Sequence, residues 1–384
     1  MKFSAYFIAC YLVSCFGAQA LDSSTPRYYF ATFDNTDQTK LYITASFDGR
    51  KFSTLTGAHV YTAPLPDTLR DPSIVRLPDA WYICHTAGNF GNVTYFTVLR
   101  STDLINWTKV TDVSTASIPN TRFTWAPEWF QDEDGSVHII VGVSYWMSRE
   151  FAMFAIHPTN ASLTTWSAPQ RLTGSAFPTF THNPNPDTPQ YVGAYDAHII
   201  KRSGEYYITY FDVNTSYILC AKSPALTGPY TPFKTGNWQG IGSYKEGGTM
   251  VSLGGPSWRF YYADAIFSKM YYIESGDNWV TWSPATLLDS TIVFNHGTVV
   301  YNPSLPEFKT TLEPLDGGSM RVRFPAVNKN GYRLETSSDL MTWNQVGSVM
   351  EGLGGEMAID HNPLGAPRMF YRIRWLPFHT PAPY

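Results

Sequence analysis

The sequence predicts an all-β protein, a five-bladed β-propeller with a small C-terminal β-sandwich-like module. The composition suits this class, because aromatic residues make up 16% of the 384 residues and charged residues only 15%. Apolar runs such as SVHIIVGV and EYYITYF alternate with a period of two, and hardly any stretch carries a 3.6-residue apolar stripe. A polar turn followed by an aromatic strand recurs at roughly 50–60 residues, close to the longer propeller-blade repeats. These turns are SFDGRKF at 46, STDLINW at 101, ASLTTW at 161, SPALTGPY at 223 and SGDNWVTW at 275.

The first twenty residues are typical of an export signal. Lys2 precedes an apolar stretch over 3–16, and the triplet AQA at 18–20 matches the small-x-small cleavage pattern. The apolar stretch is too short to span a bilayer. We therefore expect residues 1–20 to be a signal peptide, and the mature protein to be secreted and extracellular. The alternative is a lipid-anchored cell-surface protein, because the LVSC box ending at Cys15 resembles a bacterial lipoprotein signal.

The pattern of the chain changes near residue 303, which separates two domains. The Pro-rich segment NPSLPEF is followed by SMRVRFPAV, GYRLETSSDLMTW and MFYRIRWL, strands of a small β module. We predict a propeller over 21–303 and this C-terminal module over 304–384. Residues 28–52 supply outer strands without an inner one, whereas the inner strand at 295–300 has no blade after it. These segments are expected to share blade five, so that no sheet edge is left at the seam.

Each blade is expected to begin with an inner strand that has a polar or ionisable residue near its start and continues apolar. Five such strands around one axis bring their first residues together at one end. One central cavity is therefore expected to be lined by Asp71, Glu128, Asp196, Glu246 and His296. The strands are RDPSIV (70–75), APEWFQ (126–131), YDAHII (195–200), EGGTMV (246–251) and NHGTVV (295–300).

A cavity with several carboxylates and one histidine has two main uses: it can bind a hard cation, or it can cleave an acetal. Glycoside hydrolysis needs one protonated carboxyl to assist the leaving oxygen and one ionised carboxylate across the sugar. An inverting enzyme separates the two by about 6.5–9.5 Å to fit a water. Different blades of a small propeller can provide that spacing, and a third carboxylate nearby would raise the pKa of the acid.

Taken in order, the five inner-strand motifs resemble those of glycoside hydrolase family 43, over roughly residues 28–302. The resemblance implies a five-bladed propeller that inverts at the anomeric carbon. It assigns Asp71 as general base, Glu246 as general acid, and Asp196 as the ionised residue that orients the acid and tunes its pKa. One position departs from the family, whose acid motif is usually Glu-Gly-Pro, because this chain has Gly248 after Glu246-Gly247. Glycine loosens a turn that proline would stiffen, which favours an altered or lost activity.

The remaining candidates are contacts to sugar or to a metal. His296, Trp125, His85 and Phe90 are predicted substrate-binding residues, with core packing as the alternative for each. The resemblance gives His296 a second interpretation, as the neighbour of a calcium site on the propeller axis. No cofactor is expected to be required, and a structural calcium ion is the one metal that the resemblance suggests. Glu128 lies between a proline and a tryptophan, which favours a structural role.

The leading functional hypothesis is a glycosidase that releases arabinose, xylose or galactose units from plant-type polysaccharides or oligosaccharides. The alternatives are a carbohydrate-binding propeller without turnover (a lectin or adhesin) and a calcium-stabilised structural propeller. A net charge of −4 provides no basic surface for nucleic acid, and only the lipid anchor would bring a membrane partner. Cys84 and Cys220 lie in separate strand-like runs, so we expect two buried thiols rather than a disulfide.

Overall fold

The regular structure of the computed structural model consists of β-strands and one short 3₁₀ segment among the described residues. The structure describes residues 26–376 except 47, 89–91, 146–148, 184, 186–189, 266–268, 291, 293–294, 302–309, 327–330, 353–354 and 364–367. The predicted signal peptide, the Pro-rich segment after residue 301 and Phe90 therefore lie outside the described residues. Two compact units account for the rest, one from Pro26 to Leu305 and one from Pro306 to Leu376.

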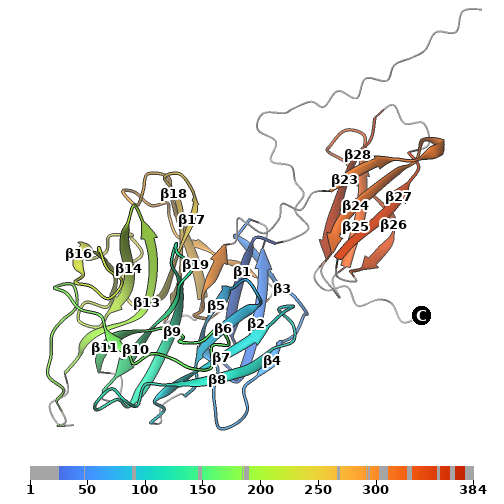
Figure 1. The fold of residues 1–384 in the computed structure, drawn as a ribbon. Helices are drawn as coiled ribbons and strands as arrows, with labels where there is room; N and C mark the ends of the chain where they lie inside the picture. Colours follow the sequence, from blue (N-terminus) through green and yellow to red (C-terminus); the bar gives the residue numbers. More distant parts are fainter. Residues whose placement is uncertain are drawn as a thin grey trace, which may run out of the picture. The chain divides into compact units, whose positions relative to one another are not determined.

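The larger unit is a five-bladed propeller, as the sequence predicts (Figure 1). Blade one is formed by β5 (Arg70–Arg76), β6 (Trp81–Thr86), β7 (Tyr95–Ser101) and β8 (Thr108–Ser114). Blade two is formed by β9 (Phe123–Gln131), β10 (Val137–Ser144), β11 (Glu150–Ile156) and β12 (Gln170–Arg171). Blade three is formed by β13 (Val192–Arg202), β14 (Glu205–Asp212), β15 (Tyr217–Ser223) and β16 (Thr231–Lys234). Blade four is formed by β17 (Lys245–Gly254), β18 (Ser257–Asp264), β19 (Lys269–Ser275) and β20 (Thr286–Leu287).

Blade five combines the two ends of the propeller sequence, and the predicted closure is confirmed. Its order is β22 (Val299–Tyr301), β1 (Tyr28–Phe33), β2 (Lys40–Ser46) and β3 (Lys51–Thr54), with β4 (Tyr61–Thr62) and β21 (Asp289–Ser290) added. The seam is the antiparallel pairing of β1 with β22, in which Tyr28 faces Tyr301 and Phe30 faces Val299. The regular strand begins at Val299, later than the predicted 295, because the residues before it form the loop that carries His296.

Hydrophobic clusters lie between consecutive blades and fix their arrangement. Four such clusters each combine side chains from two neighbouring blades, from blades one and two through to blades four and five. Blades two and three are also joined directly, because β11 pairs with β13 in parallel. The propeller axis is therefore set by packing among all of the blades rather than by any single sheet.

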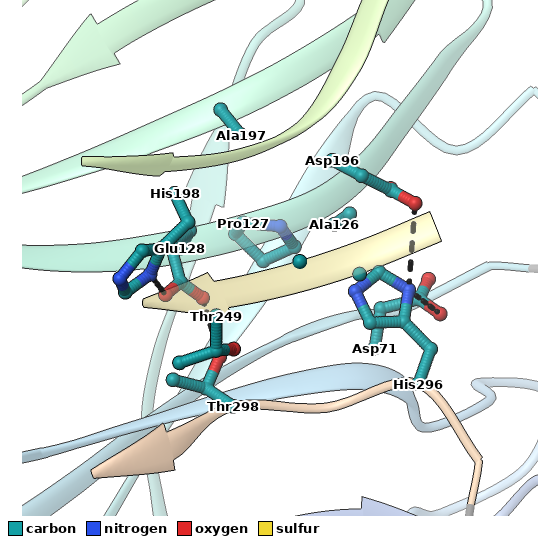
Figure 2. A pocket seen from close by; sticks show the side chains of 12 residues that line it. Asp71, Ala126, Pro127, Glu128, Asp196, Ala197, His198, Thr249, His296 and Thr298 are labelled. Carbon is teal, nitrogen blue, oxygen red and sulfur yellow. Dashed lines mark hydrogen bonds and ion pairs between the residues drawn. The ribbon is translucent and has the colours of Figure 1, made fainter. Parts of the chain in front are cut away.

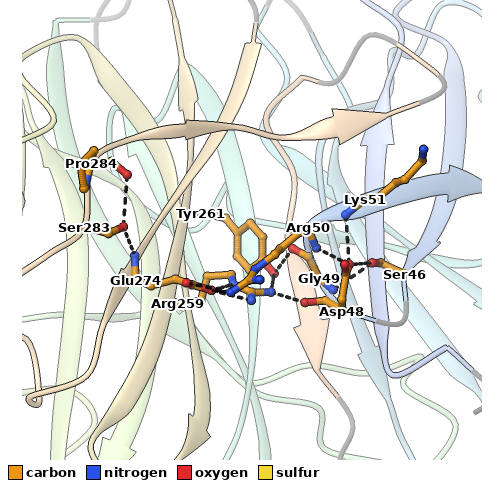
Figure 3. A network of polar contacts seen from close by, with 10 residues as sticks. All are labelled: Ser46, Asp48, Gly49, Arg50, Lys51, Arg259, Tyr261, Glu274, Ser283 and Pro284. Carbon is orange, nitrogen blue, oxygen red and sulfur yellow. Dashed lines mark hydrogen bonds and ion pairs between the residues drawn. The ribbon is translucent and has the colours of Figure 1, made fainter. Parts of the chain in front are cut away.

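A buried arginine fastens the seam blade to blade four (Figure 3). The Arg259 guanidinium on β18 donates to Glu274 Oε1 at 2.6 and 2.9 Å, and to the Asp48 backbone oxygen at 2.6 Å. Tyr261 donates from the same strand to the Gly49 oxygen at 2.7 Å. The turn after β2 is thereby held by hydrogen bonds from a strand more than 200 residues later. We call this network the Arg259 clasp.

The turn STDLINW at 101 has a geometry that is found again outside the propeller. Asp103 Oδ1 accepts two backbone amides that follow it, Leu104 adopts a left-handed φ of 66°, and Trp107 donates to the Leu104 oxygen at 3.0 Å. The same arrangement forms around Asp339 and Trp343 in the smaller unit. The motif is therefore a local turn between strands that either fold can use, which explains why it recurs outside the propeller.

The smaller unit is a β-sandwich of two three-stranded sheets with its own core. One sheet is ordered β23 (Thr311–Pro314), β24 (Met320–Ala326), β27 (Gly355–His361), with a 3₁₀ turn at Asp316–Gly318. The other is ordered β26 (Asn344–Glu351), β25 (Gly331–Ser337), β28 (Phe370–Leu376). Phe324, Tyr332 and Leu334 are fully buried between them.

The two cysteines of the described residues are free and buried, which confirms the prediction of thiols for Cys84 and Cys220. Burial raises the pKa of both thiols, so neither is a reactive thiolate. Within the described part of the chain, no helix has the length and apolar character needed to cross a membrane.

Candidate active site

The inner strand of each of the first four blades contains a bulge near its start, and the site is built on these bulges. Two residues of the inner strand oppose one residue of the next strand at Asp71-Pro72, Ala126-Pro127, Asp196-Ala197 and Gly247-Gly248. The first residue of each pair has a positive φ, between 43° and 63°. Asp71 and Asp196 therefore stand at the first position of a bulge, where the sequence predicted a place near the start of the strand. A bulge bends the strand and turns a side chain out of the regular alternation, here towards the axis.

Two of these bulges and the loop before β22 place three predicted residues in one axial cavity. Figure 2 shows that Asp71, Asp196 and His296 point toward one another from three different elements. His296 Nδ1 lies 3.2 Å from Asp71 Oδ1 and 3.6 Å from Asp196 Oδ2. All three side chains are largely buried, with His296 exposed by 16%. The cavity holds only about 10 Å³, room for about one water.

The charges in this cavity separate Asp71 from the other carboxylates. Burial by itself would raise the pKa of Asp71, but the Arg70 charge, His296 and a 2.9 Å hydrogen bond from Thr86 lower it to about 2. Burial by itself would lower the pKa of His296. The negative charges of Asp196 and Asp71 outweigh this and raise the pKa to about 10. Asp71 is therefore an ionised carboxylate beside a cationic imidazole.

Asp196 and Glu246 have the opposite electrostatic character. Burial raises the pKa of Asp196 to about 8; the His296 charge opposes this, whereas Glu246 and Asp71 add to it. Burial also raises the pKa of Glu246, with His296 again opposing and Asp71 adding. That Asp196 is the ionised member of this pair stays a prediction, because the two carboxyls are coupled through the His296 charge and each other. Asp196 and Glu246 together retain a proton near neutral pH, because a further negative charge is disfavoured.

Glu246 occupies a different position from the other two carboxylates. It lies one residue before the bulge of β17, paired with Ala263 of β18, and its side chain is partly exposed. It is not among the residues that line the axial cavity. Its electrostatic coupling to Asp196 and His296 places it near them, at the side of the cavity from which the inner strands begin.

Glu128 lies one level deeper along the axis, two residues beyond the bulge position of β9. Its carboxylate is held by His198 Nδ1 at 2.7 Å and by Thr298 Oγ1 at 2.5 Å (Figure 2). The other ring nitrogen of His198 lies 3.2 Å from the Met250 oxygen. Glu128 therefore links blades two, three and five by hydrogen bonds, farther along the axis than Asp71 and Asp196. This geometry agrees with the structural role that the sequence favoured for it.

The two glycines after Glu246 are required by close packing. A Cβ at Gly247, where φ is +63°, would lie 2.2 Å from His296 Cδ2. A Cβ at Gly248 would lie 2.5 Å from Cζ of Phe260. The Phe260 ring thus occupies the space that a proline side chain would need at position 248. The departure from Glu-Gly-Pro follows from this packing, and the Glu246 backbone keeps its place in β17.

The remaining predicted sugar contacts are not brought to the axial cavity. Trp125 precedes the bulge of β9 and is partly exposed, with its ring 5.4 Å from Phe151 and 6.1 Å from Tyr195. His85 on β6 is 1% exposed, and burial lowers its pKa to about 4. Neither lines the cavity, and a substrate contact by either one stays a prediction.

The axial site lacks a cluster of protein ligands for a metal ion among the described residues, and a calcium ion near His296 stays a prediction. Among the described residues, no group of three or more His, Cys, Asp or Glu side chains is arranged to hold one. His296 Nδ1 faces two carboxylates as a donor, which removes it as a ligand at that nitrogen. We therefore derive no chemical step through calcium.

Two contributors escaped the sequence analysis. Arg70 is the first residue of β5 and the main charge that keeps Asp71 ionised. His198 fixes Glu128 from the neighbouring blade. A signal for both was present, since Arg70 directly precedes Asp71 and His198 lies two residues after Asp196 in YDAHII.

A closed five-bladed propeller with three coupled carboxylates at one end of its axis defines a glycosidase-type protein. A family model related to glycoside hydrolase family 43, described as a probable glycosyl hydrolase domain, matches residues 25–301. The chain belongs to this family, which confirms the predicted resemblance and makes it an O-glycosyl hydrolase. No curated protein sequence matches the chain significantly.

Several solved structures are similar to this chain at low sequence identity. The endo-arabinase from Bacteroides thetaiotaomicron is 12% identical, with a TM-score of 0.49 over 65% of this chain and 89% of that one. The α-L-arabinofuranosidase from Lactobacillus brevis is 13% identical, with a TM-score of 0.44 over 84% and 97%. An exo-β-1,3-galactanase from Clostridium thermocellum is 11% identical, with a TM-score of 0.44 over 78% and 60%. Similarity at this level carries no information on the sugar that this chain accepts.

Proposed function

We propose that this protein is a secreted, inverting glycosidase that releases arabinose, xylose or galactose units from plant-type polysaccharides or oligosaccharides. One observation carries the proposal: three coupled carboxylates from three blades have pKa values displaced in opposite directions. The pKa of Asp71 is lowered to about 2, whereas that of Asp196 is raised to about 8 and that of Glu246 is also raised. An inverting glycosidase needs this division between an ionised base and a protonated acid.

In the proposed reaction, Asp71 takes a proton from the water that attacks the anomeric carbon. Glu246 donates its proton to the departing glycosidic oxygen, so that the leaving group departs as an alcohol. Asp196 disfavours loss of that proton, because a second negative charge beside Glu246 is costly in a buried site. His296 holds Asp71 and Asp196 in place through its Nδ1 contacts.

The proposal includes export and requires no cofactor. Secretion rests on the N-terminal sequence alone, and the lipid-anchored form at Cys15 is its alternative. Structural calcium has no support from the described donor groups, so removal of divalent ions should leave hydrolysis unchanged. Dialysis against a chelator, followed by an assay with and without added calcium, measures this.

The decisive experiment compares carboxylate variants on a natural glycoside and on an aryl glycoside with a good leaving group. Glu246→Ala should lose most activity on the natural substrate but retain much of it on the aryl substrate, which needs no acid. Asp71→Ala should lose activity on both, by about 10²-fold or more, because the water then lacks its base. Glu133→Gln is the matched control, since this carboxylate is 68% exposed on a hairpin. Near-normal turnover by Asp71→Ala on both substrates would refute the assignment of the base.

A carbohydrate-binding propeller without turnover is the second candidate, because Gly248 departs from the acid motif of the family. The same experiment separates the two functions. A lectin should bind sugar with no product formed by the wild-type chain, and its carboxylate variants would have no turnover to lose. A screen with aryl arabinofuranoside, xyloside and galactoside substrates answers this first.

A further inference from the structure

A second pocket, much larger than the axial cavity, lies on blade two. Its volume is about 320 Å³, within the range of small-molecule sites. Its lining combines aromatic rings with polar and cationic groups, among them Asn120, Tyr145, Arg171, Phe180 and His182. The proposed catalytic residues contribute nothing to this pocket.

Several lining residues of the pocket lie at the same end of the propeller as the catalytic carboxylates. Asn120 precedes β9, and Tyr145 directly follows β10, whose last residue pairs with the first residue of β9. His182 lies in the connection that leads to β13, the strand of Asp196. The start of each inner strand is the catalytic end, so these lining residues lie toward the end of the propeller that carries the catalytic carboxylates.

A buried carboxylate that catalysis does not use fixes one wall of the pocket. Glu150 is 1% exposed, and its Oε2 lies 2.5 Å from His182 Nδ1. Its other oxygen accepts the Asn183 backbone amide at 3.0 Å. Since the two ring nitrogens of an imidazole point in different directions, Nε2 of His182 is left for the pocket. The ring is thus oriented in advance of any ligand.

Arg171 supplies a positive charge to the lining of the pocket. Its guanidinium lies 5.5 Å from the Phe180 ring centroid, and the Tyr145 ring is 5.9 Å from that of Phe180. Within the described part of the chain, no carboxylate forms an ion pair with Arg171. A flat guanidinium beside aromatic rings can bind a carboxylate with two donors while the rings cover the apolar face of a sugar.

We propose that this pocket binds a hexuronate unit, so that the substrate is an acidic, uronate-bearing glycan. This inference rests on the proposed function, because the uronate would belong to the polysaccharide that the catalytic site cleaves. Arg171 would bind the carboxylate, His182 would contribute a second polar contact, and Phe180 with Tyr145 would form the stacking surface. A neutral sugar would leave the Arg171 charge desolvated without a partner, which disfavours it.

The test is calorimetric titration with trigalacturonate and with neutral galactotriose. The protein is the full-length Glu246→Gln variant, in which loss of the acid should suppress hydrolysis of natural glycosides. Trigalacturonate should bind saturably, and Arg171→Gln should weaken that binding about tenfold or more. Arg122→Gln is the matched control, because Arg122 is an exposed arginine before β9 that lies outside the pocket. Its binding of trigalacturonate should equal that of the parent. Any binding of galactotriose should be unaffected by Arg171→Gln.

The inference is overturned if trigalacturonate does not bind, or if Arg171→Gln binds it as tightly as Arg122→Gln does. A stronger effect of Arg171→Gln on galactotriose than on trigalacturonate also overturns it. Hydrolysis by the wild-type protein is measured in parallel on neutral arabinan, xylan and galactan and on uronate-bearing xylan and pectin. Hydrolysis without uronate binding refutes only the pocket, whereas uronate binding without hydrolysis of any glycan refutes the proposed function.

Discussion

Replacing Arg259 by methionine should destabilise the propeller at its seam. Arg259→Met keeps much of the aliphatic volume but removes the charge and the donors of the Arg259 clasp. The Arg259 side chain is 4% exposed, so its hydrogen bonds to Glu274 and to the Asp48 oxygen are made away from water. Breaking a buried ion pair costs about 3–5 kcal/mol, because the remaining charge loses its partner.

The structure places this variant at the lower end of that range. Glu274 is 29% exposed and keeps a second partner, the 54% exposed Arg50, at 3.0 Å. Tyr261 retains its hydrogen bond to the Gly49 oxygen. We therefore expect a loss of about 3 kcal/mol for Arg259→Met. Arg50→Met removes only an exposed pair with the same carboxylate, and should cost about 1 kcal/mol or less.

Equilibrium unfolding in urea, followed by tryptophan fluorescence, measures both variants against the wild type. The single variant Glu274→Gln and the double variant Arg259→Met/Glu274→Gln complete a cycle that isolates the coupling of the pair. Equal losses for Arg259→Met and Arg50→Met would refute the reasoning, since they would show that the buried position of Arg259 has no consequence. A coupling energy near zero would show that the ion pair between Arg259 and Glu274 does not stabilise the propeller.

Three further results are expected. First, kcat/KM should fall as the pH rises through about 8, because Asp196 and Glu246 then lose the proton that they retain. It should not fall in mildly acidic buffer. A decline of kcat/KM with rising pH that begins below neutral pH would contradict this. Second, Gly247→Ala should lose most activity, since its Cβ meets the His296 ring, whereas the control Gly276→Ala has nothing within 4 Å and should be normal in the same glycosidase assay. Third, a chain truncated after the propeller should still hydrolyse its substrate, because the C-terminal module has a separate core. If circular dichroism shows that the truncated propeller is folded but the assay finds no activity, the module contributes to the site.

The order of the inner strands was predictable because it depends on patterns within short segments. Period-2 alternation gives strands wherever one face is buried, and the repeat of about 50–60 residues gives the blades. The closure of blade five also followed from counting, since outer strands near Tyr28 and an inner strand near Val299 each lacked a partner. Asp71 and Asp196 could be assigned to one cavity for the same reason, because equivalent positions in a propeller meet at its axis.

The protonation states of the carboxylates and their positions along the propeller axis could not be predicted, because they depend on residues from other blades. Asp71 and Asp196 stand at equivalent bulge positions. Arg70 and Thr86 stabilise the ionised form of Asp71. Among the described residues Asp196 has no comparable partners, so burial favours its neutral form. Glu128 belongs to the same sequence pattern but lies two residues deeper, because Ala126-Pro127 occupies the bulge of its strand. The sequence by itself determined which segments become strands and which carboxylates meet. The tertiary structure decided which of those carboxylates is charged, because a buried group takes the protonation state that its neighbours across the axis can stabilise.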